Sequence, residues 1–373
     1  MRVIVSGGGT GGHIFPAVSI ADKLHQLNPA SEILFVGAEG KMEMEKVPAA
    51  GYRIVGLPIV GLQRQLSLRN IVNDLKLPFK LIGSLRKAGK IIREFKPDVV
   101  VGVGGYASAP LLYMAQKLHY PTLIQEQNGF AGLANKMLSR KADSICVAYE
   151  DMDRFFPKDK IVLSGNPIRP GMDSSLKGKK AQACEFYSMD SAKKHILVIG
   201  GSLGSRTLNN AMKAWIEAGC PAGEGVEVLW QCGKYYKAEM DAFMSSHPCK
   251  CVRHTDFIAR MDLAYALADV VISRSGASSV SEICAIGKAA VFVPSPNVAE
   301  DHQTHNSMAL VRKGAALLVK DSEAAEKMLP TALCLCKNDS ERERIENCAL
   351  SLAKTQAAQS IADEVYRIAA KRK

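Results

Sequence analysis

The feature that most constrains this chain is the alternation of short, continuously apolar runs with longer amphipathic stretches. Strands buried on both faces of a parallel sheet have this continuous apolar character, whereas half-exposed strands alternate apolar with polar residues. The pattern therefore predicts a mostly parallel α/β sheet, with helices over 17–27 and 131–138 between some of the strands. The expected strands are Val3–Val5, Ile33–Val36, Arg53–Val55, Val99–Val101, Thr122–Ile124, Ile145–Val147 and Ile161–Leu163.

A change in composition near the middle of the chain indicates a second domain. The turn Gly165-Asn166-Pro167 is followed by a polar, lysine-rich stretch, 177–194, after which the strand pattern starts again. Because 373 residues exceed what one core comfortably holds, two α/β domains of similar build are expected. The last segment, from about 345 to 370, is predicted to be helical and could pack on either domain. The second set of expected strands is Ile196–Ile199, Val226–Leu229, Val270–Ile272 and Ala290–Val293.

Charge and cysteine usage narrow the class of protein. The formal net charge of +11 suits an anionic partner such as phosphate, nucleic acid or an acidic membrane surface, although it also serves solubility. The ten cysteines include no CxxC pair, and the closest pairs, Cys249 with Cys251 and Cys334 with Cys336, predict reduced thiols without a disulfide framework or a zinc site. The apolar start runs straight into glycines, which argues against a secretory signal. A membrane-spanning helix is not expected, because no apolar run is long enough, and peripheral attachment stays open.

Three turns share one design, in which an apolar strand is followed by a glycine cluster and a helix. They are Gly7–His13 (the first loop), Gly102–Tyr106 (the second loop) and Gly200–Gly204 (the third loop). Glycine lets the backbone turn tightly and approach a ligand, while the following helix start offers N–H groups and the positive end of a dipole. One such loop is more often structural than functional. Three at equivalent places favour phosphate or pyrophosphate binding and two halves that face each other across a cleft.

The first loop also satisfies the dinucleotide fingerprint G-x-G-x-x-G through Gly7, Gly9 and Gly12. A dehydrogenase would need an acidic residue at the end of the second strand to bind the ribose. Here the strand Ile33–Val36 is followed by Gly37-Ala38, and the first acidic residue is Glu39. That interpretation also leaves the third loop unexplained. A dehydrogenase is therefore disfavoured.

Glu282 lies on the expected helix that follows the strand Val270–Ile272 and the turn Ser273–Ala277. A carboxylate in the first turns of such a helix can accept both ribose hydroxyls. The pattern Ser279-x-x-Glu282 is also a capping box, and the spacing alone favours capping.

A polar cluster, Asp301–Asn306, follows the expected strand Ala290–Val293. His302 and His305 have a spacing compatible with metal ligation, but no matching third ligand motif appears elsewhere in the sequence. The amide side chains of Gln303 and Asn306 suit a hydroxyl-rich ligand better, so a sugar contact is favoured over a metal site.

Six motifs occur in an order and with separations that resemble the MurG family of glycosyltransferases. They are Gly8-Gly9-Thr10-Gly11-Gly12-His13-Ile14-Phe15-Pro16-Ala17, Val103-Gly104-Gly105-Tyr106, Glu126-Gln127-Asn128-Gly129, Gly165-Asn166-Pro167-Ile168-Arg169, Gly200-Gly201-Ser202-Leu203-Gly204-Ser205-Arg206 and Arg274-Ser275-Gly276-Ala277. The resemblance runs from residue 1 to about 315 and continues weakly to the end. It implies a GT-B fold, with two Rossmann-like α/β domains whose parallel sheets face each other across a deep cleft. Residues 1–165, joined by a C-terminal helix over about 355–373, would serve the acceptor and the membrane, and residues 166–354 would bind UDP-N-acetylglucosamine (UDP-GlcNAc).

The resemblance also implies a reaction. N-acetylglucosamine would pass from UDP-GlcNAc to the 4-hydroxyl of the muramyl sugar of lipid I (undecaprenyl-pyrophosphoryl-MurNAc-pentapeptide). The product would be lipid II for peptidoglycan, with inversion at the anomeric carbon. No cofactor, metal ion or nucleic acid partner is expected. Helix N-termini and Arg169 would stabilise the leaving UDP.

The family pattern places the donor contacts mainly in the second domain. Ser202 would contact phosphate, Ile258 would meet the uracil through its backbone, and Glu282 would hold the ribose. The resemblance thereby reverses the preference for capping at Glu282, although one carboxylate can do both. Ala277 would line the nucleotide and sugar, and Asn128, Arg169 and Gln303 would hold the sugar or phosphate. The first-loop residues Thr10, Gly11 and Gly12 would complete the donor site from across the cleft, and Gly104, Gly105 and Tyr106 would form the acceptor loop.

His13, at the end of the first loop, is the candidate catalytic base. Inversion by one displacement needs a base opposite the departing UDP, and an imidazole titrates near neutrality. It would take the proton of the acceptor hydroxyl as the new bond forms. The alternative is that His13 only caps the helix start or orients the acceptor.

The stretch Leu75–Arg93 combines apolar residues at helical spacing with flanking cations. An apolar stripe edged by lysine and arginine suits an anionic bilayer surface, although it also describes an ordinary core-facing helix. Because lipid I is membrane-anchored, the stretch is interpreted as a membrane contact, with the protein peripheral on the cytoplasmic face of the inner membrane. The apolar residues are Leu75, Phe79, Ile82 and Leu85, and the cations are Lys76, Lys80, Arg86, Lys87, Lys90 and Arg93.

Two other functions would use the same loops. Another GT-B enzyme acting on UDP sugars, such as a lipid glycosyltransferase or a UDP-GlcNAc epimerase, is the nearest alternative. An epimerase would change UDP-GlcNAc without an acceptor, whereas a MurG-like transferase needs lipid I. A non-catalytic nucleotide-sugar sensor could keep the loops but would have no use for a base at His13.

Overall fold

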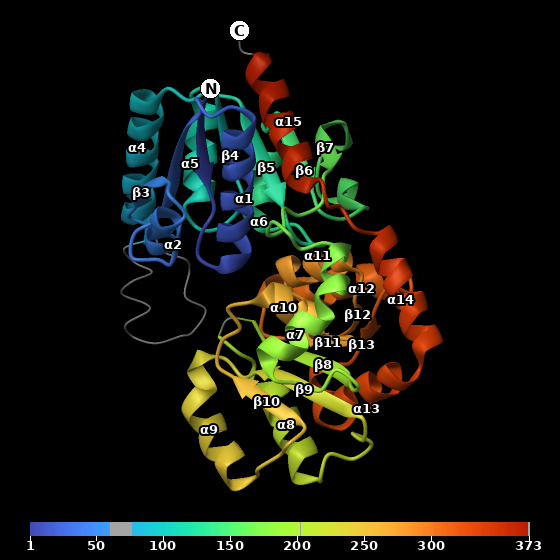
Figure 1. Ribbon diagram of the computed structural model, residues 1–373. Helices are drawn as coiled ribbons and strands as arrows, with labels where there is room; N and C mark the ends of the chain where they lie inside the picture. Colours follow the sequence, from blue (N-terminus) through green and yellow to red (C-terminus); the bar gives the residue numbers. More distant parts are fainter. Residues whose placement is uncertain (60–76, 202, 372–373) are drawn as a thin grey trace. The chain divides into compact units, whose positions relative to one another are not determined.

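The computed structural model describes residues 1–59, 77–201 and 203–371, with the backbone alone for 77–79 and 299 (Figure 1). The chain divides into two compact units. Unit 1 comprises Met1–Ile168 together with Thr355–Lys373, and unit 2 comprises Arg169–Lys354. Each unit is an α/β layer structure around its own parallel sheet.

The sheet of unit 1 has the strand order β3-β2-β1-β4-β5-β6-β7 in the described residues, and every neighbouring pair is parallel. The order reverses between β1 and β4, which pair directly. Such a switch point opens a crevice at the carboxyl ends of the strands, where ligands of open α/β sheets bind. The strands are β1 (Arg2–Ser6), β2 (Glu32–Ala38), β3 (Arg53–Leu57), β4 (Val99–Gly102), β5 (Thr122–Glu126), β6 (Ser144–Val147) and β7 (Ile161–Leu163).

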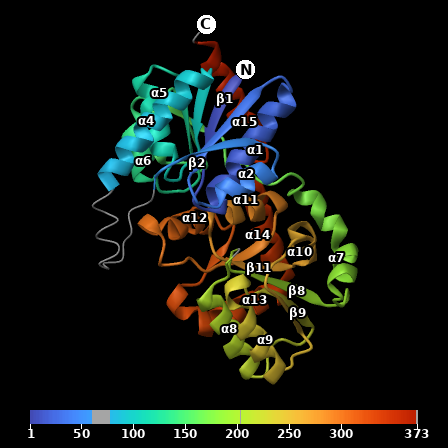
Figure 2. The ribbon, with the colours of Figure 1, turned by 90° about the vertical axis from the view of Figure 1, so that its left-hand side faces the viewer.

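Helices cover both faces of this sheet, as Figures 1 and 2 show. On one face α1 and α15 pack against each other and bury Ile20 and Val365 in a common core with Val3 and Val5. On the other face α4 and α5 bury residues such as Ile92. Burying each large aliphatic side chain stabilises the fold by about 1.5–3 kcal/mol. The helices are α1 (Gly11–Leu27), α2 (Glu43–Ala49), α4 (Leu77–Phe95), α5 (Ser108–Lys117), α6 (Leu133–Ser139) and α15 (Ala357–Ala370), with 3₁₀ turns η1 (Met152–Arg154) and η2 (Lys158–Lys160).

The sheet of unit 2 repeats this plan, with the strand order β10-β9-β8-β11-β12-β13 in the described residues and all pairs parallel. Its switch point lies between β8 and β11. The strands are β8 (Lys194–Ile199), β9 (Val226–Gln231), β10 (Val252–Thr255), β11 (Val270–Ser273), β12 (Ala289–Phe292) and β13 (Leu317–Leu318).

The helices of unit 2 also form two layers (Figure 1). One layer is built by α8, α9 and α13, whose side chains share a core with alternate residues of β8 and β11. The helices are α7 (Lys180–Tyr187), α8 (Arg206–Glu217), α9 (Lys237–Ser246), α10 (Met261–Leu267), α11 (Ala277–Ile286), α12 (His302–Val311), α13 (Ala324–Lys337) and α14 (Asp339–Ser351). The 3₁₀ turns are η3 (Ser174–Lys179), η4 (Lys234–Tyr236), η5 (Ala299–Asp301) and η6 (Asp321–Glu323).

The two parallel α/β sheets expected from the apolar runs are confirmed. Two short edge strands were not expected: β10, in which Arg253 is exposed, and the two-residue β13. The segment from about 345 to 370 is helical as predicted but is interrupted, because α14 ends at Ser351 and α15 begins at Ala357. The break matters for the architecture, since α14 packs on α11 in unit 2 and α15 packs on α1 in unit 1.

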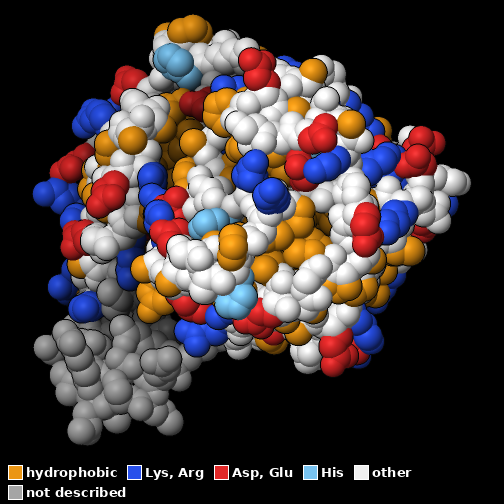
Figure 3. Space-filling view, turned by 60° about the horizontal axis from the view of Figure 1, so that its bottom comes forward, with side chains coloured by type: hydrophobic (Ala, Val, Ile, Leu, Met, Phe, Trp, Pro, Cys, Tyr) orange, Lys and Arg blue, Asp and Glu red, His pale blue; other side chains and the backbone are white. Residues whose placement is uncertain are grey.

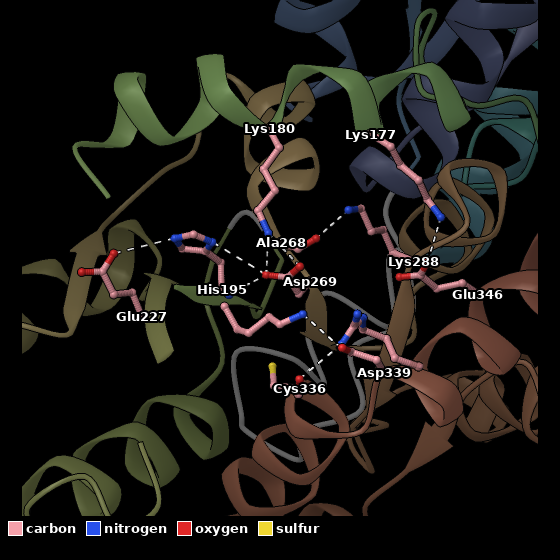
Figure 4. Close-up of polar contacts among 12 residues, drawn as sticks. Lys177, Lys180, His195, Glu227, Ala268, Asp269, Lys288, Cys336, Asp339 and Glu346 are labelled. Atoms are coloured by element: carbon pink, nitrogen blue, oxygen red, sulfur yellow. Dashed lines mark hydrogen bonds and ion pairs between the residues drawn. The ribbon is translucent and has the colours of Figure 1, made fainter. Parts of the chain in front are cut away.

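A network of buried and partly buried polar side chains occupies the amino edge of the unit 2 sheet (Figure 4). Asp269, just before β11, accepts hydrogen bonds from Nζ of Lys180 and from the backbone N–H of His195, each at 2.8 Å. The imidazole of His195 is fully buried, with its ring nitrogens 3.7 Å from the carboxylates of Glu227 and Asp269. Against the effect of burial, Lys180 and His195 hold the pKa of Asp269 well below its usual range. Ionised Asp269 therefore stabilises the folded state at pH values above the usual carboxyl pKa. This contribution is lost as the pH falls towards the lowered pKa of Asp269.

Surface charge is mixed on the face shown in Figure 3, where lysine and arginine side chains lie among aspartate and glutamate side chains. The surplus of positive charge is therefore not gathered into one block on that face. Every helix among the described residues is too short or too polar to cross a bilayer.

Candidate active site

Glycine loops flank the switch point of each sheet. In unit 1 the first loop follows β1 and the second loop follows β4, the two strands between which the order reverses. In unit 2 the third loop follows β8, and the turn Arg274–Gly276 follows β11. The loops singled out from the sequence thus lie where ligands of such sheets bind.

The first loop is shaped by a buried carboxylate from outside the loop. Glu43, at the start of α2, accepts hydrogen bonds from the backbone N–H of Gly9 at 2.8 Å and from that of Ala38 at 3.0 Å. A Cβ on Gly8 would lie 2.2 Å from Oε1 of Glu43, so a larger residue at this position would have to displace the carboxylate and break its hydrogen bonds. Glu43 therefore fixes the backbone that leads into His13.

His13 is the third residue of α1 and is half-buried. Its Nδ1 lies 3.1 Å from the carbonyl oxygen of Gly8 and 3.3 Å from the hydroxyl of Thr10. A carbonyl oxygen can only accept, so Nδ1 carries the proton in this hydrogen bond and the lone pair is on Nε2. The loop thereby selects the tautomer that a base acting through Nε2 requires.

The second loop packs directly against the imidazole of His13. Gly104 has a φ of +97°, and a Cβ there would lie 2.7 Å from Cδ2 and 2.8 Å from Nε2 of His13. Gly105, with a φ of +91°, approaches the backbone of Gly8 so closely that a Cβ would lie 2.4 Å from its carbonyl oxygen. Tyr106 is half-exposed beside Gly9. The predicted residues of the first and second loops therefore form one cluster in unit 1.

Asn128 follows β5 and is held by a buried glutamate. Glu126 accepts hydrogen bonds from the backbone N–H and from Nδ2 of Asn128, from the N–H of Gly132 and from Nδ2 of Asn135. Burial raises the pKa of Glu126, although these four donors oppose the shift. The carboxyl group organises the turn that presents Asn128 at the carboxyl edge of the sheet.

Unit 2 contains a polar pocket of about 720 Å³ at its switch point. Backbone of the third loop and the start of α8 form one side, and side chains from the ends of β11 and β12 form the other. The lining residues are Gly200, Gly201, Gly204, Ser205, Arg206, Thr207, Asn210, Tyr236, Arg274, Gly276, Ser279, Ser295, Asn297, Gln303, Asp321, Ser322 and Ala325. Such a pocket, with glycine backbone at a helix start, suits a phosphate-bearing ligand.

Arg274 connects three segments that line this pocket through hydrogen bonds. Its Nε donates to the hydroxyl of Ser205 at 3.0 Å, and its Nη1 donates to the carbonyl of Val293 at 2.9 Å and to Asp321 at 2.5 Å. The hydroxyl of Ser205 is also the N-cap acceptor of α8. Arg274 therefore positions the third loop and the strand end of β12.

Gln303 lies in the first turn of α12 and lines the pocket. Its Oε1 accepts from the backbone N–H of Ser295 at 2.9 Å, and its carbonyl accepts from the hydroxyl of Ser275 at 2.8 Å. The expectation that Asn306 contacts a sugar was wrong. Asn306 is fully buried and donates through Nδ2 to the carbonyl of Ser275 at 3.2 Å, so it holds the turn after β11.

Glu282 forms a buried ion pair rather than a helix cap. The N-cap of α11 is Gly276, so Ser279 is already inside the helix and the capping-box interpretation was wrong. The carboxylate accepts a bidentate pair from Arg169, with Nε to Oε1 and Nη2 to Oε2 both at 2.7 Å, and a further bond from Tyr265 at 3.3 Å. Burial raises the pKa of Tyr265 well above its usual value, so it donates as a neutral phenol.

Ile258 and Ala277 of unit 2 are not among the described residues that line the pocket. Ile258 follows β10 with its side chain buried, and Ala277 is the first residue of α11. Gly11 and Gly12 open α1 beside His13. Ser202, expected to contact phosphate, lies outside the described residues.

Sequence reasoning missed the residues that hold the site in shape. Glu43 acts on Gly9, 34 positions away, and Asp321 acts on Arg274, 47 positions away. A local sequence pattern therefore could not indicate their roles. Arg274 and Glu126 belong to motifs that had been recognised, yet their roles as clamps depend on contacts that only the fold creates.

Comparison with known families gives two matches that together span most of the chain. Residues 3–147 match the glycosyltransferase family 28 N-terminal domain, and residues 195–365 match the glycosyltransferase family 28 C-terminal domain. The chain is 50% identical over 367 residues to the UDP-N-acetylglucosamine–N-acetylmuramyl-(pentapeptide) pyrophosphoryl-undecaprenol N-acetylglucosamine transferase of Parabacteroides distasonis, covering 98% of each chain.

Solved structures agree with these matches. The crystal structure of Acinetobacter baumannii MurG is similar at 28% identity and a TM-score of 0.77, covering 98% of this chain and 99% of that one. The UDP-GlcNAc 2-epimerase from Neisseria meningitidis bound to UDP-GlcNAc has a TM-score of 0.66 at 16% identity, covering 98% of this chain and all of that chain (100%), which reflects the shared fold alone.

Proposed function

Because the chain belongs to glycosyltransferase family 28 and, within it, to the MurG family, we propose that it transfers N-acetylglucosamine from UDP-GlcNAc to lipid I. The acceptor group is the 4-hydroxyl of the muramyl sugar, and the product is lipid II for peptidoglycan synthesis. The observation that carries the proposal is the 50% identity to the Parabacteroides distasonis transferase over nearly the full length of both chains. The geometry of the site supports an assignment of residues to each substrate.

The donor binds in unit 2, with its diphosphate on the third loop. The pocket there offers glycine backbone, the start of the twelve-residue helix α8 and the hydroxyl of Ser205. Helix N-termini favour anions through their unpaired N–H groups and the helix dipole. Ser202, within this loop, remains predicted to contact phosphate, and Gln303 is assigned to the sugar from the opposite wall.

The ribose is assigned to Glu282, which Arg169 orients. Both carboxylate oxygens accept a hydrogen bond from Arg169, and Oε2 also accepts from Tyr265, so the second lone pair of Oε1 is left for a ribose hydroxyl. The bidentate pair holds the carboxylate rigid, and a second ribose hydroxyl can take the place of Tyr265 on Oε2. Arg169 adds positive charge for the departing UDP, and Ala277 and the backbone of Ile258 complete the nucleoside contacts.

His13 is the base that accepts the proton of the acceptor hydroxyl. As the oxygen attacks the anomeric carbon, its proton passes to Nε2, and the bond to UDP breaks with its electrons on the diphosphate. One displacement of this kind inverts the anomeric carbon. Support comes from Gly8 and Gly104, which set the tautomer and the position of the ring. Thr10, Gly11, Gly12, Gly105, Tyr106 and Asn128 are assigned to substrate contacts around it.

Lipid I requires contact with an anionic membrane surface, for which α4 is the candidate. Leu81 and Ile82 are exposed, while the core side of the helix is formed by Ala88, Ile91 and Ile92. Part of the predicted apolar stripe, Leu75, together with Lys76, lies outside the described residues, as does the side chain of Phe79. We place the protein as a peripheral enzyme on the cytoplasmic face of the inner membrane.

The membrane assignment predicts that Leu81→Ser with Ile82→Ser lowers binding to vesicles that contain anionic lipid. The loss is expected to be about tenfold, since two large apolar side chains leave the interface. Co-sedimentation measures it, with Phe186→Ser, an exposed aromatic residue of unit 2, as the matched control. Equal binding by the wild type and the α4 variant, with folding intact, contradicts the assignment.

Transfer of labelled N-acetylglucosamine from UDP-GlcNAc to a lipid I analogue tests the function. Labelled lipid II is expected, and UDP-GlcNAc incubated without acceptor should remain unchanged. Conversion of UDP-GlcNAc to an epimer without acceptor would identify the alternative to which the shared fold points. Donor binding with no turnover of either kind would instead identify a nucleotide-sugar sensor.

A further inference from the structure

Three cysteines of unit 2 meet although they are far apart in the sequence. Cys220 lies in the loop between α8 and β9, and Cys249 and Cys251 lie just before β10. The Sγ atom of Cys220 is 3.4 Å from that of Cys249, which is 3.1 Å from that of Cys251. Within the part of the chain that the structure describes, this is the one group of three metal-ligating side chains whose ligand atoms all lie within 4.8 Å of one another.

The spacing of the three sulfurs fits a metal ion better than a disulfide. Tetrahedral zinc with Zn–S bonds of about 2.3 Å separates its sulfur ligands by about 3.8 Å. Reaching that separation lengthens the Cys220–Cys249 distance from 3.4 Å by about 0.4 Å and the Cys249–Cys251 distance from 3.1 Å by about 0.7 Å, which changes in side-chain torsion can supply. A disulfide requires a sulfur–sulfur distance of about 2.05 Å and would leave the third thiol unused.

Backbone hydrogen bonds hold the three residues in place. The N–H of Cys220 donates to the carbonyl of Trp215 at 3.0 Å, and the residue has a φ of +57°. The carbonyl of Cys251 accepts from Val228 at 2.8 Å in the sheet. The three cysteines pack against the core of unit 2 and are partly accessible to solvent. A cation there would have one face open to a solvent ligand.

The thiols are poor candidates for redox chemistry. Burial and the neighbouring Cys249 raise the pKa of Cys251 to about 11, and burial and Cys249 also raise the pKa of Cys220. Reactive cysteines have lowered pKa values, because the thiolate is the nucleophile. Cys220 and Cys251 therefore lack the lowered pKa of a reactive thiol.

We propose that Cys220, Cys249 and Cys251 form a three-thiolate site for a thiophilic d¹⁰ cation of the zinc class, with water as the fourth ligand. Each thiol releases its proton to solvent as its sulfur binds the ion, and no oxidant or reductant takes part. The three residues precede β9 and β10 at the amino ends of those strands, whereas the donor pocket lies at the carboxyl ends. The ion therefore has a structural role, tying the loop after α8 to the start of β10.

Cobalt and zinc binding to the full-length protein test this site. Protein reduced with a phosphine and freed of metal is titrated with Co²⁺, which gives a thiolate-to-cobalt charge-transfer band and tetrahedral d–d bands when bound by thiolates. We expect both signals, and we expect Zn²⁺ to abolish them. Zinc affinity, measured by competition with a chromophoric chelator, is expected to fall more than about tenfold in Cys249→Ser, since even an outer-shell change costs that much. Cys334→Ser, at an exposed thiol on α13, is the matched control and should bind as the wild type does.

Thermal unfolding supplies a readout that does not depend on the cobalt spectrum. Zinc is expected to raise the Tm of the wild type and of Cys334→Ser but not that of Cys249→Ser or Cys251→Ser. Sugar transfer should be retained in all four proteins, so failure of the metal site is distinguishable from failure of the proposed enzymatic function. A cobalt spectrum without thiolate bands, or equal zinc affinity in the wild type and Cys249→Ser, overturns the proposal. So does air oxidation that joins Cys220 to Cys249 in wild-type protein that binds no zinc.

Discussion

The first and third loops have the same sequence design but are built into different sites. Both follow the central strand of a parallel sheet and both start a helix. Glu43, Gly104 and Gly105 of unit 1 pack closely against the first loop. His13 is the side chain of this loop to which we assign a chemical role. The third loop opens into a polar pocket of about 720 Å³ whose walls Arg274 braces.

A glycine loop therefore determines only the path of the backbone. The residues that pack around the loop determine whether it can bind a ligand. Glycines 8, 104 and 105 are needed for close packing, since a Cβ on any of them would meet other atoms at less than 3 Å. Gly201, in the third loop, has open space around the same position and a φ of +86°. In our account the first loop positions a base, and the third loop binds a diphosphate.

The largest effect is expected from His13→Ala. Removal of a general base lowers kcat by about 10²–10⁴-fold. The Kd for UDP-GlcNAc should stay unchanged, because the donor pocket lies in unit 2. Steady-state transfer and calorimetric titration measure the two quantities. His25→Ala, an exposed histidine of the same helix, is the control and should keep full activity. Near wild-type turnover in His13→Ala would show that His13 is not the base.

Gly104→Ala tests whether the packing of the second loop is what positions His13. The added Cβ meets the imidazole at 2.7 Å and must displace it. Displacement of a reacting group by about 1 Å costs on the order of 10²-fold in kcat. Gly40→Ala is the matched control, since Gly40 also has a positive φ but has no atom within 4 Å of the added Cβ. Equal kcat values for the two variants would contradict the role given to Gly104.

Arg169→Ala removes the partner of a buried carboxylate in unit 2. The side chain of Glu282 is 4% exposed, so its desolvated charge is left with Tyr265 alone. We expect the free energy of unfolding to fall by about 1–3 kcal/mol, as for other buried groups that lose a partner. Chemical denaturation measures it. Arg260→Ala, which breaks the exposed pair with Asp262, should change it little. Equal losses in the two variants would mean that the Arg169–Glu282 pair is no more than a surface ion pair.

Gln303→Ala is expected to have the smallest effect and the opposite kinetic signature to His13→Ala. Loss of one sugar hydrogen bond and of the contact with Ser295 should weaken UDP-GlcNAc binding about tenfold. The rate at saturating donor should change little. Gln26→Ala, in α1, serves as the control. An unchanged Kd in Gln303→Ala would remove this residue from the donor site.

The fold was predictable from the sequence because burial on both faces makes central parallel strands continuously apolar. The edge strand β10 escaped this criterion, since Arg253 is exposed and the run is only Val252–Thr255. The break between α14 and α15 could not be predicted from apolar residues either. Both helices bury apolar residues, but α14 packs in unit 2 and α15 packs in unit 1.

The candidate site was only partly predictable, and the missing part consists of long-range partners. Glycine loops and His13 are local features that a motif displays. The role of Glu282 depended on Arg169, which lies 113 positions away, so spacing wrongly favoured a helix cap. The three-cysteine cluster was missed for the same reason, because Cys220 joins Cys249 only through the fold.

The division of labour between the first and third loops is tested by measuring kcat and the Kd for UDP-GlcNAc in His13→Ala, in Gln303→Ala and in the double variant. The kcat loss is expected to follow His13→Ala, and the Kd loss is expected to follow Gln303→Ala. In the double variant the two losses should multiply, as for independent residues. If His13→Ala weakened donor binding as much as it slowed transfer, or Gln303→Ala lowered kcat at unchanged Kd, the division of labour between the two loops would be contradicted.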